Sequence, residues 1–242
     1  MTKNKISTLT KKIITASLDE SIEASLEVQD LILAKEDNKK LLEPILIDNL
    51  KKEKSVSKLR RIIWAISVFE IKDAKPLLRK FINHEDQLIR EEAILALGIL
   101  KDKDSIKDLI KIVKDKEDVA REEAAIALGL MGVEEALDEL IEQLNDEDIN
   151  IVIATCLALS YLRNPKAIKP LINKLIDDNK YIRRYAAKAI FTFGRTALPY
   201  LKDALKDAPI FKRRYINKLI NEIDRSSFTE VHQTFQKVSI PR

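Results

Sequence analysis

The 242-residue sequence has little of several residue types, and each scarcity limits what the protein can be. It contains one cysteine, Cys156, so no disulfide can form within the chain. Only four glycines and 5% aromatic residues are present, and no glycine-rich phosphate-binding motif occurs. Ala, Leu, Ile, Glu and Lys dominate instead, and these are mostly strong helix formers. The composition therefore predicts an almost wholly helical protein.

Long apolar runs are also lacking. No window approaches the roughly 18 apolar residues of a membrane-spanning helix, and the N-terminal residues lack the apolar run of a signal peptide. A single thiol is typical of a reducing compartment. Hydrophobic residues still make up 45% of the chain, which is enough for a core. We therefore expect a soluble cytoplasmic protein.

A 31-residue repeat organises the chain. The stretch LIREEAILALGIL at residues 88–100 recurs as VAREEAAIALGLM at residues 119–131. Alanine occupies five positions spaced 31 residues apart, namely Ala65, Ala96, Ala127, Ala158 and Ala189. A second column holds small side chains, namely Ser67, Gly98, Gly129 and Ser160. The small column predicts that neighbouring helices approach each other closely at these positions.

Each repeat has the pattern of two helices. Ile106, Leu109, Ile110 and Val113 fall at i, i+3, i+4 and i+7, which is one face of a helix. Two helices cannot cover their apolar faces alone, so we expect successive copies to stack in one continuous domain over residues 1–224. The pattern predicts about seven hairpins, with approximate spans 5–36, 39–70, 73–101, 104–132, 134–163, 165–194 and 196–224.

Residues 225–242 follow the last hairpin as a tail. Four apolar residues in it keep helical spacing, namely Phe228, Val231, Phe235 and Val238. We interpret the tail as a short helix that either caps the last hairpin or docks on another chain.

The repeat resembles a known family. Its pattern is Leu-x-x-Leu-Ile, an acidic turn, and then Ile/Val-Arg-x-x-Ala-x-x-Ala-Leu-Gly, which is similar to HEAT repeats, a group with an armadillo-like helical fold. IREEAILALG and AREEAAIALG are most similar to the short bacterial subtype named after phycobilin (PBS) lyases, and the resemblance is best over residues 39–208. It implies an all-α fold, a right-handed α-solenoid whose second helices line the concave face.

In this family an acid in the turn of each hairpin meets an arginine near the start of the second helix. Three turns of this chain carry such a pair, with the first residue four positions before the arginine: Asp86 with Arg90, Glu117 with Arg121, and Asn179, an amide in place of the acid, with Arg183. We interpret these arginines as structural groups that cap and tie the turns.

Enzymes that resemble HEAT-repeat proteins have functional residues that this chain lacks. Deoxyhypusine hydroxylases hold iron with several His-Glu pairs, whereas this chain has one such pair, His84 with Glu85, and one other histidine, His232. Cys156 shares a repeat column with alanines, which predicts a buried thiol. With a single tryptophan, the chain has no obvious aromatic cage of the kind used by HEAT-like DNA glycosylases. We therefore predict no catalytic, cofactor-binding or metal-binding residues.

The charge changes sign along the chain. Residues 1–83 hold 17 Lys/Arg against 12 Asp/Glu, residues 84–162 hold 8 against 20, and residues 163–242 hold 18 against 7. Like charges also occupy equivalent positions of the second helices, where their fields add. The same glutamates would favour the positive end of a helix dipole, so a purely structural reason for them remains open.

The sequence therefore predicts a non-catalytic scaffold or adaptor that binds a macromolecular partner, most simply a protein, through its concave face. The residues predicted to make contact are Arg60, Arg61, Trp64, Glu91, Glu92, Glu122, Glu123, Arg184, Lys188, Arg213 and Arg214. Trp64 either contacts the partner or fills a gap between repeats. Two alternative functions stay open: nucleic-acid binding through the basic C-terminal end, and a phycobilin-lyase-like subunit that acts with a partner chain.

Overall fold

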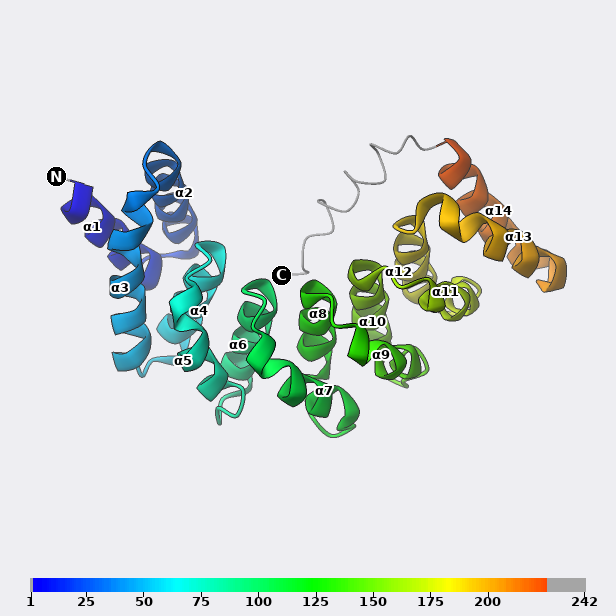
Figure 1. Cartoon of the computed structure of the whole chain (residues 1–242), viewed down its shortest axis with the longest axis horizontal. Helices are drawn as coiled ribbons and strands as arrows, with labels where there is room; N and C mark the ends of the chain where they lie inside the picture. The colour runs from blue at the N-terminus through cyan, green and yellow to red at the C-terminus, as the bar shows by residue number, and fades with distance from the viewer. Residues whose placement is uncertain (1, 226–242) are drawn as a thin grey trace. The chain divides into compact units, whose positions relative to one another are not determined.

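The computed structural model of the chain describes residues 2–225, which contain fourteen α-helices and no β-strand. In chain order the helices form seven successive pairs, each with a first and a second helix (Figure 1). This confirms the predicted all-α fold, a solenoid of helical hairpins. Within residues 2–225 no helix is both long and apolar enough to cross a membrane.

The helix bounds agree closely with the hairpin spans expected from the sequence. The first helices are α1 (Thr2–Thr15), α3 (Asp37–Lys52), α5 (Lys75–Phe81), α7 (Ile106–Lys114), α9 (Leu137–Gln143), α11 (Ile168–Leu175) and α13 (Leu198–Asp207). The second helices are α2 (Leu18–Ala34), α4 (Val56–Val68), α6 (Gln87–Ile99), α8 (Arg121–Met131), α10 (Ile149–Leu162), α12 (Lys180–Phe191) and α14 (Ile210–Arg225). Short 3-10 turns precede five first helices, at Lys72–Ala74, Lys103–Ser105, Glu134–Ala136, Pro165–Ala167 and Gly194–Ala197.

The last helix, α14, ends at Arg225. The predicted tail helix, with Phe228, Val231, Phe235 and Val238, lies outside the described residues.

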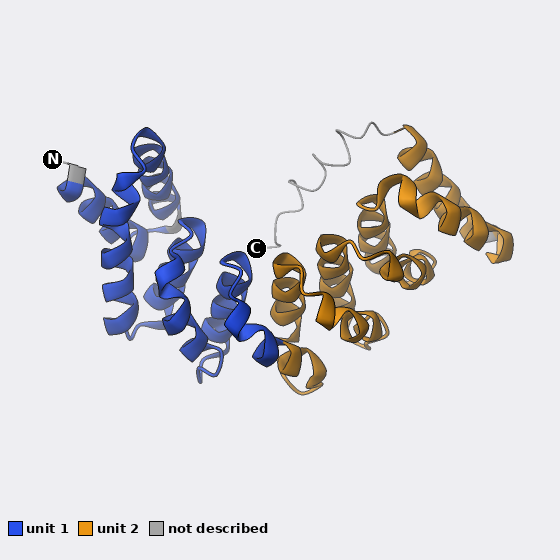
Figure 2. Ribbon diagram, viewed as in Figure 1, with its two compact units in different colours: residues 1–109 blue, residues 110–242 orange. Residues whose placement is uncertain are grey.

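The chain divides into two compact units, unit 1 with residues 1–109 and unit 2 with residues 110–242 (Figure 2). The boundary falls within α7. In unit 1, α4 packs against α6; in unit 2, α8 packs against α10, α10 against α12, and α12 against α14. From α4 to α6 in unit 1 and from α8 to α14 in unit 2, successive second helices are therefore neighbours, whereas in the first hairpin it is α1 that packs against α4. The predicted single domain over residues 1–224 stays a prediction.

The apolar columns of the repeat form the core. All five alanines that are spaced 31 residues apart are buried, with at most 2% of their surface exposed. The leucines at equivalent positions of the first helices, Leu78, Leu109, Leu140, Leu171 and Leu201, are all fully buried. Small residues on one helix and branched residues on the next fill the space between hairpins at high density.

A left-handed backbone residue follows the second helix in five successive hairpins. These residues are Glu70 (φ 49°), Lys101 (φ 53°), Gly132 (φ 71°), Arg163 (φ 53°) and Gly194 (φ 55°), and they lie 31 residues apart. After α4, α6 and α8 two backbone hydrogen bonds accompany the turn, as in a Schellman motif. After α6, for example, the Asp102 N–H donates to the Leu97 carbonyl at 3.0 Å and the Lys101 N–H to the Gly98 carbonyl at 3.1 Å. A left-handed turn thus precedes each of the five hairpins from α5 to α14.

Replacement of Lys101 by glycine is expected to stabilise the protein. A side chain in the left-handed region is strained, and glycine removes this strain at a smaller entropic cost, so Lys101→Gly should raise the free energy of unfolding by about 0.5–1 kcal/mol. Urea denaturation followed by circular dichroism measures the change. Lys107→Gly, within helix α7, is the control and should lower stability by about 1 kcal/mol. Equal losses in both variants would show that the turn does not require φ above zero.

Gly129 permits a close approach of two second helices in unit 2. A Cβ atom placed on it would lie 2.5 Å from the Ala158 Cα and 2.6 Å from the Ala158 carbonyl oxygen. These atoms belong to the backbone of α10, so they cannot move aside as a side chain would. The contact confirms, for this position, the close approach that the small column predicts.

Gly129→Ala is expected to destabilise the protein although alanine is the better helix former. The added methyl group must separate α8 from α10, and overpacking of this kind lowers stability by about 1–3 kcal/mol. Gly132→Ala adds the same methyl group where no atom lies within 4 Å, so its loss should be limited to about 1 kcal/mol from the positive φ. Thermal and urea unfolding of both variants measure the difference. An unchanged or increased stability of Gly129→Ala would contradict the close approach.

Candidate partner-binding surface

In unit 1 the predicted contact residues partly bind one another. Arg60 on α4 and Glu92 on α6 form an ion pair of 3.0 Å, and 40% and 27% of their side chains are exposed. The Arg61 guanidinium donates to the carbonyl of Ala16, which follows α1. Arg60, Arg61 and Glu92 therefore hold α4 against α6 and α1, which reduces the charge that they can present to a partner.

Two other predicted contact residues lie on α4 and α6, and two more lie on α8. Glu91 accepts a hydrogen bond of 2.7 Å from the Gln87 side chain, one turn earlier on α6. Trp64 is half-buried on α4, which is compatible with packing and with contact alike. In unit 2, Glu122 and Glu123 are half-buried in the first turn of α8, where the helix dipole favours acids.

The arginines tie the turns as predicted, but their partners differ from the family pattern. Asp86 caps α6 by accepting the Ile89 N–H at 3.2 Å, whereas Arg90 donates to the carbonyls of His84 and Glu85. The expected pairing of the acid with the arginine four residues later is therefore wrong in this turn. Each group binds backbone atoms instead, since the helix start needs an acceptor and the loop carbonyls need a donor.

The other two turns vary this arrangement. Arg183 donates to the carbonyls of Asp177 and Asp178, both at 2.7 Å, while Asn179 caps α12. Arg121 reaches the carboxylate of Asp146 in the next hairpin, and both side chains are only 13% exposed. Burial raises the pKa of Asp146, but hydrogen bonds from the Asp148 N–H and from Arg121 outweigh it, so the pKa lies below its usual value.

An exposed basic surface lies on α12 and α14. Helix α12 contains four cations and no acid, and three of its cations, Lys180, Arg184 and Lys188, are exposed. Arg213 and Arg214 are exposed on the neighbouring α14. We call Arg184, Lys188, Arg213 and Arg214 the basic surface; they lie on two helices of unit 2 that pack against each other, and Arg213 also donates to the carbonyls of Ala208 and Lys206. Neither helix has an acid in its first turn.

Tyrosine rings hold several cations of this region in place. The guanidinium carbons of Arg183 and Arg214 each lie 4.8 Å from the centre of the Tyr215 ring. Arg214 also donates to the Tyr215 hydroxyl at 2.8 Å, and this hydrogen bond is the main reason why the pKa of Tyr215 is lowered. The Lys188 ammonium lies 5.1 Å from the ring centre of Tyr185.

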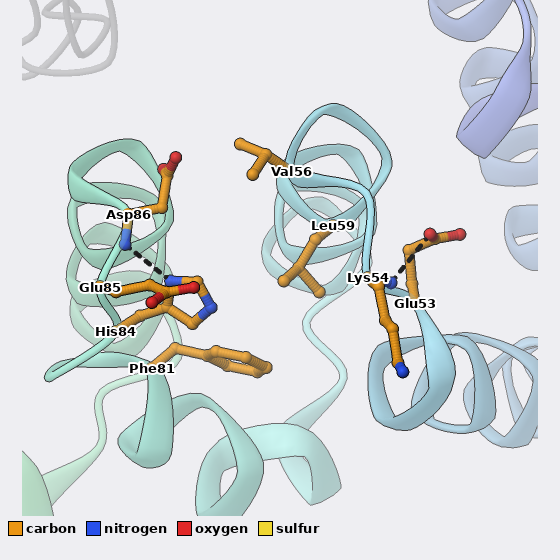
Figure 3. A pocket seen from close by; sticks show the side chains of 8 residues that line it. All are labelled: Glu53, Lys54, Val56, Leu59, Phe81, His84, Glu85 and Asp86. Carbon is orange, nitrogen blue, oxygen red and sulfur yellow. Dashed lines mark hydrogen bonds between the residues drawn. The ribbon is translucent and has the colours of Figure 1, made fainter.

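A cleft that the sequence did not indicate lies in unit 1 (Figure 3). Its volume is about 680 Å³, and it opens between the loop that joins α3 to α4 and the loop that joins α5 to α6. Its lining residues are Glu53, Lys54, Val56, Leu59, Phe81, His84, Glu85 and Asp86. Asp86 is the turn acid of its repeat, but the repeat pattern does not predict a cleft, because the cleft arises where two irregular loops face each other.

His84 is more constrained than a freely solvated loop residue. It is half-buried in this cleft, with its ring centre 5.7 Å from that of Phe81. Its Nδ1 accepts the Asp86 N–H at 3.0 Å (Figure 3). Among residues 2–225 no group of three or more His, Cys, Asp or Glu side chains is arranged to hold a metal ion.

Cys156 is fully buried on α10, as the sequence predicts. Burial raises the pKa of its thiol to about 12. The thiolate is the reactive form of cysteine, so this sulfur is poorly suited to act as a nucleophile.

The Cys156 thiol should therefore react only when the protein opens. At pH 8 we expect Ellman's reagent to modify the native protein at least about a thousandfold more slowly than the urea-unfolded protein, because the thiolate fraction and access both fall. Absorbance at the wavelength of the released dye measures both rates. Rapid modification of the native protein would show that the sulfur is accessible and would reopen a chemical role for it.

Comparisons with known proteins give the same fold. A family model described as HEAT repeats matches residues 43–129, 106–190 and 137–220. The complex of CpcE and CpcF of phycocyanin lyase from Nostoc sp. PCC7120 is similar, with a TM-score of 0.55, 19% identity, and coverage of 89% of this chain and 93% of that chain. An engineered protein is similar with a TM-score of 0.51, 17% identity, and coverage of 92% and 69%. No curated protein matches the chain. At such identities the structural similarity shows the fold alone.

Proposed function

Because the chain belongs to the HEAT-repeat family, we propose that it is a non-catalytic scaffold or adaptor that binds a protein partner through the face of its second helices. One observation carries this proposal: α12 has four cations and no acid, and it exposes Arg184 and Lys188. Among the described residues neither of these two side chains takes part in an ion pair. Exposed charge that does not serve the fold is available for recognition.

The chemistry of the candidate nucleophile and base also favours binding over catalysis. The Cys156 sulfur is buried with a raised pKa, and the His84 Nδ1 already accepts a backbone hydrogen bond. His232 lies outside the described residues. The phycocyanin lyase complex shares the fold at 19% identity, and no catalytic residue set carries over from it to this chain.

Nucleic-acid binding is the second candidate, and the basic surface on α12 and α14 is the observation that favours it. Lys/Arg side chains near aromatic rings are typical of surfaces that bind nucleic acids. A protein partner is preferred because exposed apolar side chains lie beside the cations, among them Tyr181 and Ile210.

The proposal is tested by affinity capture from extracts of the source cells with quantitative mass spectrometry. The test variant Glu91→Lys/Arg184→Glu changes one exposed or half-buried charge on a second helix of each unit and keeps the net charge. We expect it to reduce the recovery of at least one protein by about tenfold or more, with binding unaffected by nuclease.

The matched control Glu142→Lys/Lys169→Glu makes the same exchange on the first helices α9 and α11, where both residues are exposed. It should recover the partner as well as the wild-type chain does. If both variants behave alike, or if nuclease removes the captured protein, the second-helix face does not bind a protein directly and the proposal is wrong.

A further inference from the structure

The second helices of unit 2 begin with a row of exposed apolar side chains. Val119 lies two residues before the start of α8, and Ile149, Tyr181 and Ile210 lie in the first turns of α10, α12 and α14. They are 51%, 43%, 51% and 84% exposed. A single exposed apolar residue is ordinary, but these four lie at or just before the starts of four successive second helices that pack against one another. Each of these helices therefore begins with exposed apolar surface.

Cations continue the same helix faces. On α12, Tyr181, Arg184 and Lys188 stand at i, i+3 and i+7, so they share one face. On α14, Ile210 is followed by Arg213 and Arg214 at i+3 and i+4. The face of α12 and α14 is thus apolar at its start and basic one to two turns later.

The neighbouring α10 adds apolar surface without charge. Its sequence, INIVIATCLALSYL, contains no charged residue, and Ile149 and Ile153 share a face at i and i+4. Ile149 is exposed and Ile153 is half-buried. A ligand that covers all three helices therefore meets aliphatic groups on one side and ammonium and guanidinium groups on the other.

We infer that the face formed by α10, α12 and α14 docks an acidic amphipathic segment of the partner protein. This inference rests on the proposed function and names the chemistry of the partner. The apolar side of the segment covers Ile149, Tyr181 and Ile210, and its carboxylates meet Arg184 and Lys188. Helical segments that bind in grooves present their anchors in this i, i+3, i+4, i+7 pattern.

Two observations favour a peptide over a nucleic-acid strand. Each tyrosine ring of this face holds a cation of its own chain, at 5.0 Å for Tyr181, 5.1 Å for Tyr185 and 4.8 Å for Tyr215. A base that stacks needs an uncovered ring face, so these contacts restrict stacking. Exposed aliphatic groups such as Ile149 and Ile210 offer nothing to a sugar-phosphate backbone, whereas leucine side chains of a peptide would cover them.

The test measures binding of defined probes by fluorescence anisotropy. The probe is a labelled peptide of about 18 residues, with Leu at i, i+3, i+4 and i+7 positions and Glu elsewhere. Three comparison probes are the same peptide with Ser for Leu, the same peptide with Lys for Glu, and a thymidine oligonucleotide of about 20 nucleotides. We expect only the Leu/Glu peptide to bind tightly, with a Kd in the micromolar range that rises with salt.

Two variants of the full chain separate the charged and apolar contributions. Arg184→Glu/Lys188→Glu should weaken binding by about tenfold or more, and Ile149→Ser/Tyr181→Ser by about fivefold or more. Lys169→Glu/Lys202→Glu makes the same charge change at exposed sites of the first helices α11 and α13 and should stay within about twofold of the wild type. All replaced residues are exposed, and circular dichroism checks that each variant is folded.

The inference is overturned if the Leu/Glu peptide does not bind, or if the Ser peptide or the oligonucleotide binds as tightly. It is also overturned if the first-helix control weakens binding as much as Arg184→Glu/Lys188→Glu does. The capture experiment decides the proposed function separately. For this purpose the capture is repeated with the single variants Glu91→Lys and Arg184→Glu. A captured protein that is lost with Glu91→Lys but not with Arg184→Glu would leave the scaffold function intact and remove this docking face.

Discussion

The left-handed turn that follows five successive second helices, α4 to α12, is the constraint on which the repeat depends. It recurs at Glu70, Lys101, Gly132, Arg163 and Gly194, with identical spacing. Because the turn fixes where the next first helix starts, the hairpins from α5 onward begin in the same register. That register keeps the alanine column buried and places Gly129 against the backbone of α10. Three of the five positions carry side chains other than glycine, so packing between hairpins must offset local backbone strain.

A regular register also determines which positions remain on the surface. Side chains at equivalent repeat positions of neighbouring second helices lie next to one another. When the residue type at such a position differs between repeats, the chemistry of the protein surface therefore differs from one helix to the next. In unit 2 the column that begins with acids on α8 becomes aliphatic on α10 and basic on α12. The hairpins share one fold, whereas these half-buried and exposed positions differ in chemistry from one hairpin to the next. Function in such a protein is therefore carried by differences between repeats.

Stability and recognition make different demands on the charged residues. Arg121, Arg183 and Arg90 are used within the fold, because each satisfies carbonyl or carboxylate groups at a turn. Arg184 and Lys188 satisfy no such group among the described residues, and they lie on a helix without acids. Mutual repulsion of these cations lowers the stability of α12, and an anionic partner would reverse that effect. This contrast separates structural arginines from candidate contact residues of the same type.

The sequence by itself determined the helical class, the 31-residue period, the hairpin boundaries and the burial of Cys156. These follow from local rules. Apolar residues at 3.6-residue spacing define the buried face of a helix, and a residue that shares a repeat column with alanines, as Cys156 does, is expected on that buried face. Only the tertiary structure decided that Arg60 pairs with Glu92, that Arg90 binds carbonyls in place of Asp86, and that two loops enclose a cleft beside His84. Those outcomes depend on the separation of neighbouring helices and on side-chain rotamers, and a residue's own sequence neighbours do not fix either. The exposure of Ile149, Tyr181 and Ile210 was decided in the same way, because an apolar residue at a helix start is buried or exposed according to what packs beside it.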